Sequence, residues 1–552
     1  MKHIINILTI VSLAATGALA AEKSNEPERQ PWAQICGPYG NFNPVQSGCK
    51  LVDSITDAKV LWISENSDLG MAKGAVLPSS FGPNAKIHCG SWAGPIVADG
   101  KVFAASRRPV KKWYELPADK NPGGAHGKNL NAFEKSADAK NYLVNLEAED
   151  IVVAMDFETG KTIWVAAEPG GILQGGHKRE GDNVMPCYYQ GKVFSISSVG
   201  VLYAYDAKTG KKLWQSDVGP VTAVLKANAA KASATLKEGK WPGDCQRPVQ
   251  GRFHISLVAA EGVLIVPTFE SGGLRGLEPA TGRELWKTPS VIGPYATPTV
   301  WNHKGRQYLL ISAGGAAKGY GSGSFSMMDP LTGKILWTVG QIGPASDASN
   351  PVAPIHNPLI ASDEHVFVNH KSKHLEVPAK DGKAGHEAGN PWNILAAYRI
   401  TPEKAELAWT MPDELKYCCE NHLDTIAMRR TVVRDGKVYH WTTKTNEGHV
   451  IDEKTGKVLA SVPFSGAPRV YVVEDRVLAT GDAAHSQSGR SGCDVSFFNL
   501  KDLQPLGASG HVPIGTTGGY EVHMEFPYVD GRWFVRTPEG QIACIDLRAP
   551  AK

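Results

Sequence analysis

Imidazole, guanidinium, phenol and carboxylate side chains recur in this 552-residue chain at or just before stretches rich in strand-forming residues. The residues of this set are His88, His177, His254, Tyr295, His356, His422, Arg429, Arg469, Glu521 and His523. Imidazoles that converge can bind a metal ion or act as acid and base near neutral pH. Arginines beside them suit an anionic or hydroxyl-rich ligand. The alternative is that these side chains cap strand ends and hydrogen-bond between neighbouring units.

A second candidate is the stretch Tyr417-Cys418-Cys419-Glu420-Asn421-His422. Adjacent cysteines in an exported protein can close a strained eight-membered disulfide ring. The alternatives are that each cysteine pairs elsewhere, or that one remains a free thiol. The sequence does not identify a metal for either candidate.

One repeated stretch predicts the elements that must position these residues. It is clearest at Asp206-Ala207-Lys208-Thr209-Gly210, which an alternating apolar run precedes and Leu213-Trp214 follows. The acid precedes the tryptophan by eight residues in the copies that end at Trp164, Trp214, Trp286 and Trp337, while Ala460 replaces the tryptophan in another copy. The alternation predicts a strand, the acid and the glycine predict a turn, and Leu-Trp predicts the next strand. The acid is therefore a turn former, and the motif is neither a metal nor a phosphate site.

A hairpin is only marginally stable alone, so the copies must pack against each other. A four-stranded unit that recurs every roughly 40–50 residues is typical of a β-propeller blade. We count eight blades, which begin near residues 94, 187, 254, 297, 357, 431, 469 and 524. The seventh lacks the Thr-Gly signature, so seven or nine blades are the alternatives.

The two ends of the chain are predicted to complete one blade together. Residues 59–63, with Trp62, match the last strand of the repeat without a blade in front of them, whereas the strands at 533–536 and 541–546 lack a Leu-Trp partner. Closure of this kind removes exposed edge strands. We therefore expect an all-β fold: one eight-bladed propeller of four-stranded antiparallel blades over residues 59–548. Residues 21–58 would be an N-terminal extension and loop, and residues 549–552 a tail.

Residues 1–20 are predicted to be a secretory signal peptide that is cleaved after Ala20. Lys2 and His3 precede a short apolar run, and Ala18-Leu19-Ala20 is a small-x-small cleavage site. The run is short for a bilayer span, and no later stretch is long enough. We therefore expect a periplasmic or secreted protein without an integral membrane segment. The net charge of +3 does not favour nucleic acid as a partner, and the sequence does not specify the oligomeric state.

Export permits disulfides, and the chain has nine cysteines. Cys36 and Cys49 would close a short loop and are the expected local pair. Three stretches, residues 107–149, 217–252 and 371–393, exceed what blades need, and a short helix is expected within residues 225–240. Such long connections are either surface decoration or walls and lids around a central funnel, and the second is favoured.

The repeat spacing, with the turns Asp99-Gly100-Lys101-Val102-Phe103 and Asp435-Gly436-Lys437-Val438-Tyr439, resembles the PQQ-like repeat β-propeller superfamily. That superfamily includes quinoprotein alcohol dehydrogenases, the assembly factor BamB and cofactor-free members such as tetrathionate hydrolase. The resemblance covers nearly all of the mature chain. It implies that the repeat tryptophans dock between neighbouring blades; these are Trp62, Trp164, Trp214, Trp286, Trp337 and Trp409.

In quinoprotein dehydrogenases a vicinal disulfide ring covers one face of PQQ, and a Glu and an Asn bind calcium beside it. By resemblance, the cofactor-binding candidates here are Cys418, Cys419, Glu420 and Asn421. The sequence departs from that pattern, because the family carries its cysteine pair early in the chain and places the calcium ligands on other blades. No counterpart of the ordered calcium ligands and catalytic aspartate is found. PQQ with calcium is one expectation, and no cofactor or a His-bound metal is the other.

The favoured function is an enzyme or binder of a small polar or anionic ligand in a central funnel lined by His, Arg and Tyr. The first expectation is a quinoprotein-like oxidoreductase, that is, a dehydrogenase. The second is a cofactor-free hydrolase or lyase of an anionic substrate, such as a tetrathionate-like compound or an acidic sugar, with Arg429 or Arg469 stabilising negative charge. The third is a non-catalytic binding or assembly propeller like BamB. The added loops and the histidines favour an enzyme.

Overall fold

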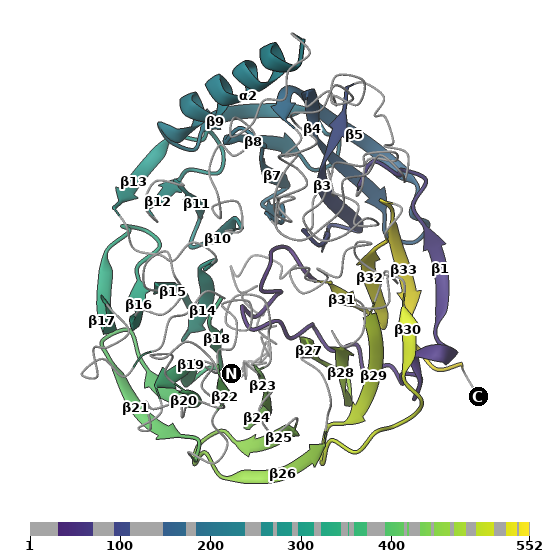
Figure 1. Ribbon diagram of the computed structural model, residues 1–552, viewed down its shortest axis with the longest axis vertical. Coiled ribbons are helices and arrows are strands. Elements are labelled where there is room, and N and C mark those ends of the chain that lie inside the picture. The colour runs from purple at the N-terminus through teal and green to yellow at the C-terminus, as the bar shows by residue number, and fades with distance from the viewer. Residues whose placement is uncertain are drawn as a thin grey trace, which may run out of the picture.

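The computed structural model forms a ring of eight antiparallel sheets (Figure 1). It describes residues 31–69, 93–110, 147–172, 184–237, 256–268, 273–289, 296–313, 322–343, 352, 358–371, 392–412, 417–418, 431–442, 447–463, 469–481, 493–512, 526–537 and 540–550. In seven of the sheets the main strands follow the chain from the innermost to the outermost, and in the eighth the outermost strand comes from the N-terminal part of the chain (Figure 1); a ring built this way is a β-propeller. The predicted eight blades of four strands are confirmed, including the irregular seventh.

Blades 1 to 4 follow one another along the first part of the chain. Blade 1 comprises β2 (Ile96–Ala98), β3 (Lys101–Pro109), β4 (Glu147–Asp156) and β5 (Thr162–Ile172). Blade 2 comprises β6 (Cys187–Tyr189), β7 (Lys192–Ile196), β8 (Val201–Asp206) and β9 (Lys212–Asp217). Blade 3 comprises β10 (Val258–Ala260), β11 (Val263–Pro267), β12 (Leu274–Leu277) and β13 (Glu284–Thr288). Blade 4 comprises β14 (Thr299–His303), β15 (Arg306–Ala313), β16 (Ser322–Met328) and β17 (Ile335–Gly343).

Blades 5 to 8 complete the ring. Blade 5 comprises β18 (Ile360–Ala361), β19 (His365–Lys371), β20 (Trp392–Ile400) and β21 (Ala405–Thr410), with β22 (Tyr417–Cys418) added to β20. Blade 6 comprises β23 (Thr431–Arg434), β24 (Lys437–Thr442), β25 (Glu447–Asp452) and β26 (Val458–Pro463). Blade 7 comprises β27 (Arg469–Val473), β28 (Arg476–Gly481), β29 (Cys493–Asn499) and β30 (Gly510–Val512). Blade 8 comprises β31 (Tyr528–Val529), β32 (Arg532–Arg536), β33 (Ile542–Asp546) and, as its outer strand, β1 (Lys59–Ile63).

The two faces of the ring differ in how they connect strands. Tight turns join the first strand to the second, as at Asp99-Gly100, where both residues have positive φ (50° and 66°) as a type I′ hairpin turn requires. The turn between the third and fourth strands lies beside it, because Phe157 N donates to Gly100 O at 3.2 Å. We call this side of the ring the turn face. The opposite side, where the second strand meets the third and one blade leads to the next, is the loop face.

The N-terminal strand closes the ring, as the sequence predicts. β1 pairs antiparallel with β33, with Lys59 opposite Asp546 and Ile63 opposite Ala543. The first strand of the chain therefore supplies the outer strand of the last blade. This pairing protects the edge of β33, which would otherwise remain open.

The repeated acid-Thr-Gly stretch is a turn that receives the tryptophan of the preceding blade. In blade 1, Asp156 Oδ1 accepts hydrogen bonds from Thr159 N (2.8 Å) and Thr159 Oγ1 (2.7 Å). Gly160 has φ +67°, and a Cβ there would collide with the ring of Trp62 from blade 8. Trp62 Nε1 also donates to Phe157 O at 3.2 Å. Glycine is therefore needed twice, for the backbone angle and for the close approach of the indole.

The other repeat tryptophans make the same bond to the next blade. The pairs are Trp164 with Ala207 O, Trp214 with Pro279 O, Trp286 with Pro330 O, Trp337 with Thr401 O and Trp409 with Glu453 O. Each tryptophan thus ties two adjacent sheets through one indole N–H and a packed ring, and the hydrophobic core lies between the sheets.

The turn of blade 7 keeps the repeat geometry without its signature residues. Asn499 stands in the position of the acid, and Leu503 takes the glycine position with φ +58°. Leu503 N donates to Asn499 O at 2.9 Å, as Gly160 N donates to Asp156 O in blade 1. The short helix expected near residues 225–240 is found as α2 (Val221–Lys237), which follows β9 on the outside of the ring (Figure 1).

Candidate functional site

Most of the candidate residues lie outside the described part of the chain. These are His88, His177, His254, Tyr295, His356, His422, Arg429, Glu521 and His523, together with Cys419, Glu420 and Asn421. Their convergence on a funnel therefore stays a prediction. The structure places Arg469, and the backbone of Cys418.

Arg469 is the first residue of β27, the innermost strand of blade 7, at the loop face. It lies opposite Thr480 of β28 and is 5% exposed. Its position follows from the strand pattern, since an apolar run, Val470 to Val473, continues from it into the core. A buried guanidinium at the loop-face end of an inner strand is consistent with the expected role in anion binding.

Arg536, which the sequence-based prediction missed, is a buried arginine of the neighbouring blade. It ends β32 at the loop face and is 1% exposed. Its Nε and Nη2 donate to Ala93 O (3.0 and 2.7 Å), and Nη2 also donates to Ala105 O (3.1 Å), so it joins blade 8 to blade 1. Its Nη1 has no hydrogen-bond partner within the described structure. Burial lowers the pKa of Arg536 to about 9.

Blade 1 also has a buried arginine, Arg107, which lies two residues further along β3 than the position equivalent to Arg536. Arg107 lies near the loop-face end of β3, is 2% exposed, and its Nε is 3.7 Å from Asp150 Oδ1. Arg469, Arg536 and Arg107 therefore belong to blades 7, 8 and 1, which are consecutive in the ring. We call these three residues the arginine sector. The sequence signal that could have identified Arg536 is a charge directly after the apolar run from Trp533 to Val535.

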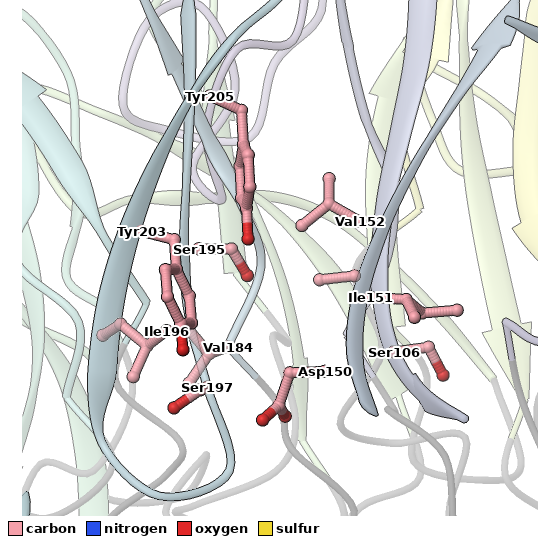
Figure 2. Close-up of a pocket in the computed structure, with 11 residues that line it drawn as sticks. Ser106, Asp150, Ile151, Val152, Val184, Ser195, Ile196, Ser197, Tyr203 and Tyr205 are labelled. Carbon is pink, nitrogen blue, oxygen red and sulfur yellow. The ribbon is translucent and has the colours of Figure 1, made fainter. Parts of the chain in front are cut away.

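Asp150 faces blade 2 across a small polar cavity (Figure 2). It accepts hydrogen bonds from Ser198 N (2.8 Å, Oδ1) and Ser198 Oγ (3.0 Å, Oδ2). Burial raises the pKa of Asp150 to about 6, although Arg107 and the Ser198 hydrogen bonds lower it. Ser195 and Tyr203 of blade 2 also line the cavity, and burial raises the pKa of Tyr203. The cavity volume of ≈ 10 Å³ accommodates about one water, so this region joins two blades and is too small for a substrate.

Ser362, His365 and Glu453 gather at the turn face between blades 5 and 6. Ser362 Oγ donates to Glu453 Oε1 at 2.5 Å, and His365 Nδ1 lies 3.0 Å from the same oxygen. Burial tends to raise the pKa of Glu453, but the bonds from His365 and Ser362 bring it below its ordinary value. In a nucleophilic triad the histidine stands between the hydroxyl and the carboxylate. Here both groups bind the carboxylate directly, so the arrangement is a structural contact between blades.

Cys418 lies at the outer side of blade 5. β22 pairs with the loop-face end of β20, with Cys418 opposite Trp392 and Tyr417 opposite Asn393. β19 pairs with β20 on the other side, so both β19 and β20 separate Cys418 from the inner strand β18. In the pairing order of the sheet, the backbone of Cys418 is therefore not a neighbour of the inner strand β18.

The structure does not show the expected disulfide between Cys36 and Cys49. Cys36 is buried, and Cys49 Sγ lies 3.7 Å from the Tyr528 hydroxyl. Within the described ranges, His, Cys, Asp and Glu side chains form no group of three or more that could hold a metal ion. No helix among the described residues has the length and apolar character needed to cross a membrane.

Comparison with protein families relates this chain to two kinds of propeller. The family model described as outer membrane protein assembly factor BamB matches residues 136–383, somewhat less than half of the chain. The quinohemoprotein alcohol dehydrogenase ADH IIB of Pseudomonas putida is 24% identical over 330 residues, which is 54% of this chain and 43% of that protein. The chain therefore matches less than half the length of this curated relative.

Solved structures of both kinds are among those to which the chain has some similarity. BamB from Moraxella catarrhalis is 14% identical, with a TM-score of 0.44 over 72% of this chain and 93% of that one. The quinohemoprotein alcohol dehydrogenase ADHIIG from Pseudomonas putida HK5 is 13% identical, with a TM-score of 0.43 over 95% of this chain and 81% of that one. Likeness at this level carries no functional conclusion.

Proposed function

Because this chain belongs to the PQQ-like repeat β-propeller superfamily, we propose that it is an exported propeller that binds a small anionic ligand on its loop face. The ligand would lie at the arginine sector of blades 7, 8 and 1, and the best-supported activity is that of a quinoprotein-like oxidoreductase. Export is expected from residues 1–20, which lie outside the described part of the chain.

The observation that carries this proposal is the burial of Arg536 without a carboxylate partner among the described residues. Its guanidinium is held by backbone carbonyl oxygens alone, and Nη1 has no partner there. Burying a charge is costly unless an opposite charge compensates it. Arg469 and Arg107 are also buried, in the adjacent blades. Arg107 Nε lies 3.7 Å from Asp150 Oδ1, so the missing carboxylate concerns Arg536. An anionic ligand at this sector would supply the missing compensation.

PQQ is one ligand of this kind, because it carries three carboxylates that guanidinium groups can bind. The sequence likeness to a quinohemoprotein alcohol dehydrogenase supports it. The fit is incomplete, since Cys418 is separated from the inner strand by β19 and β20 and does not fit a vicinal pair that covers a cofactor at the axis. We therefore derive no reaction step through PQQ or calcium. If it binds, PQQ supplies the oxidant for the dehydrogenase reaction.

Two alternatives share the same architecture. In a cofactor-free hydrolase or lyase, the anionic ligand would be the substrate, and the arginine sector would stabilise charge that develops in the reaction. In a binding or assembly propeller, which the match to the BamB family model favours, the loop face would contact a protein and the arginines would be structural.

The absorbance spectrum and metal content of the purified, exported protein separate these functions. A bound quinone chromophore with stoichiometric calcium is the result expected for the dehydrogenase. A colourless protein that gains no chromophore after incubation with PQQ and calcium would contradict the dehydrogenase. Thermal stabilisation by tetrathionate or by an acidic sugar would then support the hydrolase or lyase, because a ligand specific for the folded state raises its stability.

A further inference from the structure

Residues 32–52 run inside the ring before the chain reaches β1. Figure 1 shows this N-terminal part of the chain, in purple, within the circle of inner strands. We call residues 32–52 the inner segment. Its order along the chain follows the order of the blades, so it winds around the axis.

The first half of the inner segment contacts blades 1 to 4. Trp32 N donates to Val97 O of β2, and Val97 N donates to Trp32 O, both at 2.9 Å. Tyr188 N of β6 donates to Ala33 O at 2.8 Å. Gln34 Oε1 accepts from Ala259 N of β10 at 2.9 Å. These bonds satisfy backbone groups on the exposed edges of innermost strands.

Close packing continues the contact at blade 4. Gly40 has φ +70°, and a Cβ there would collide with the carbonyl oxygen of Val300 in β14. Trp32 is 0% exposed, and Cys36 and Phe42 are each 1% exposed. The inner segment therefore packs tightly at these positions and is not a loose chain passing through open space.

The second half contacts blades 6, 7 and 8. Asn43 Nδ2 donates to Val433 O of β23 at 2.6 Å. Arg434 Nη1 donates both to Gln46 Oε1 (2.8 Å) and to Glu474 O (2.7 Å), which connects the inner segment with blades 6 and 7. Val52 N donates to Leu547 O of blade 8 at 2.8 Å.

Glu474 is the strongest attachment point of this half. It lies in the first turn of blade 7 with φ +47° and is 6% exposed. Its carboxylate accepts from Ser47 N (3.0 Å), Ser47 Oγ (2.8 Å) and Gly48 N (2.9 Å) of the inner segment, and from the Tyr528 hydroxyl of blade 8 (3.1 Å). One carboxylate thus holds the inner segment and two blades together through charge-assisted hydrogen bonds.

The contacts lie close to the turn face. Four of the contacted residues are separated from the first turn of their blade by a single residue: Val97, Tyr188, Ala259 and Val433. Glu474 lies in such a turn itself. We propose that the inner segment closes the axis of the ring at the turn face, with Glu474 as its anchor. Any ligand near the axis then enters and leaves through the loop face. This inference concerns access alone and does not depend on which ligand binds.

Hydrogen exchange of the full-length protein tests the closure without any ligand. The amides of Trp32, Ser47, Gly48 and Val52 should exchange as slowly as those of the blade strands. Glu474→Ala should accelerate exchange of the Ser47 and Gly48 amides by about tenfold or more, while the strand amides keep their protection. Rapid exchange of the inner segment in the unmodified protein would overturn the proposal.

Glu261→Ala is the matched control. Glu261 occupies the same turn position in blade 3, with φ +50°, but its carboxylate accepts from Gln307 N at 2.7 Å and not from the inner segment. The Glu261→Ala variant should leave the hydrogen exchange of the Ser47 and Gly48 amides unchanged. Equal acceleration by both variants would contradict the role of Glu474.

Quenching of tryptophan fluorescence gives an independent measurement, which remains informative if Glu474→Ala folds poorly. The difference between the unmodified protein and Trp32→Phe isolates the emission of Trp32. That emission should resist iodide in the unmodified protein, because Trp32 is fully buried. Quenching comparable to that of an exposed tryptophan would show that the turn face is open.

Discussion

The hydroxyl of Tyr439 in blade 6 lies 2.9 Å from the carbonyl oxygen of Leu500 in blade 7, to which it donates a hydrogen bond. At six other blade junctions a repeat tryptophan makes this bond. Blade 6 has Ala460 at the tryptophan position, and Tyr439 lies in the same row of the sheet, opposite Val450, which is itself opposite Ala460. Tyr439, on β24, therefore supplies the hydrogen-bond donor that a tryptophan at position 460, on β26, would otherwise supply.

Tyr439→Phe should destabilise the protein by roughly 1–2 kcal/mol, because it leaves the Leu500 carbonyl oxygen without its donor. Chemical unfolding measures the change. Tyr398→Phe is the control, since Tyr398 is also largely buried but its hydroxyl has no hydrogen bond among the described residues. If both variants lost the same free energy of unfolding, the proposal that Tyr439 takes the role of the missing tryptophan would be contradicted.

Two glycines with similar backbone angles should respond differently to alanine. Gly210 (φ +71°) lies against the Trp164 ring, whereas a Cβ at Gly100 (φ +66°) would meet no atom within 4 Å. Both variants incur a backbone penalty of about 1–2 kcal/mol. Gly210→Ala should lose a further ~1–3 kcal/mol, because its methyl group displaces the indole. Equal free energies of unfolding for the two variants would show that the indole contact adds nothing.

Asp150 should make stability depend on pH. Its pKa in the folded state, about 6, lies above the ordinary value of 3.8. Between these pH values the folded state binds the proton and the unfolded state loses it, so the stability contributed by the neutral carboxyl is lost as pH rises from about 4 to 6. Asp150→Asn, which keeps an oxygen for Ser198 N, should remove this dependence.

The measurement is the free energy of unfolding of both proteins at pH 4.5 and pH 7. The unmodified protein should lose about 2 kcal/mol more than Asp150→Asn between these two pH values. Parallel pH profiles for the two proteins would mean that Asp150 titrates at an ordinary pKa in the fold.

The blades could be predicted from the sequence because their signals are local. Asp156, Thr159 and Gly160 form their turn within five residues, and the next strand carries Trp164 at a fixed distance. A blade is harder to predict where the residues of the local signal are replaced. In blade 7, Asn499 and Leu503 form the same turn, but their residue types are not those of the repeat signature. The backbone geometry, and not the side-chain pattern, is what the seventh blade preserves.

Arg469 is among the residues predicted from the sequence, but the contacts of the inner segment and of Arg536 could not be predicted, because they join residues far apart in the chain. Asn43 binds the backbone of Val433, and Arg536 binds that of Ala93. No spacing in the sequence records such pairs. The candidate histidines, which the sequence places before blades, remain predictions, since most lie outside the described residues.

Titration calorimetry with PQQ, tetrathionate and an acidic sugar tests the central claim, that the arginine sector binds an anionic ligand, most directly. It compares the full-length protein with Arg469→Met, Arg536→Met and Arg536→Lys. The control is Arg283→Met, since the Arg283 side chain is 64% exposed and pairs with Glu278 on the surface. We predict saturable binding of at least one ligand that weakens at least tenfold in both methionine variants, is partly retained in Arg536→Lys, and is unchanged in the control. Binding that is equal in all these proteins, or absent for every ligand, would contradict the claim.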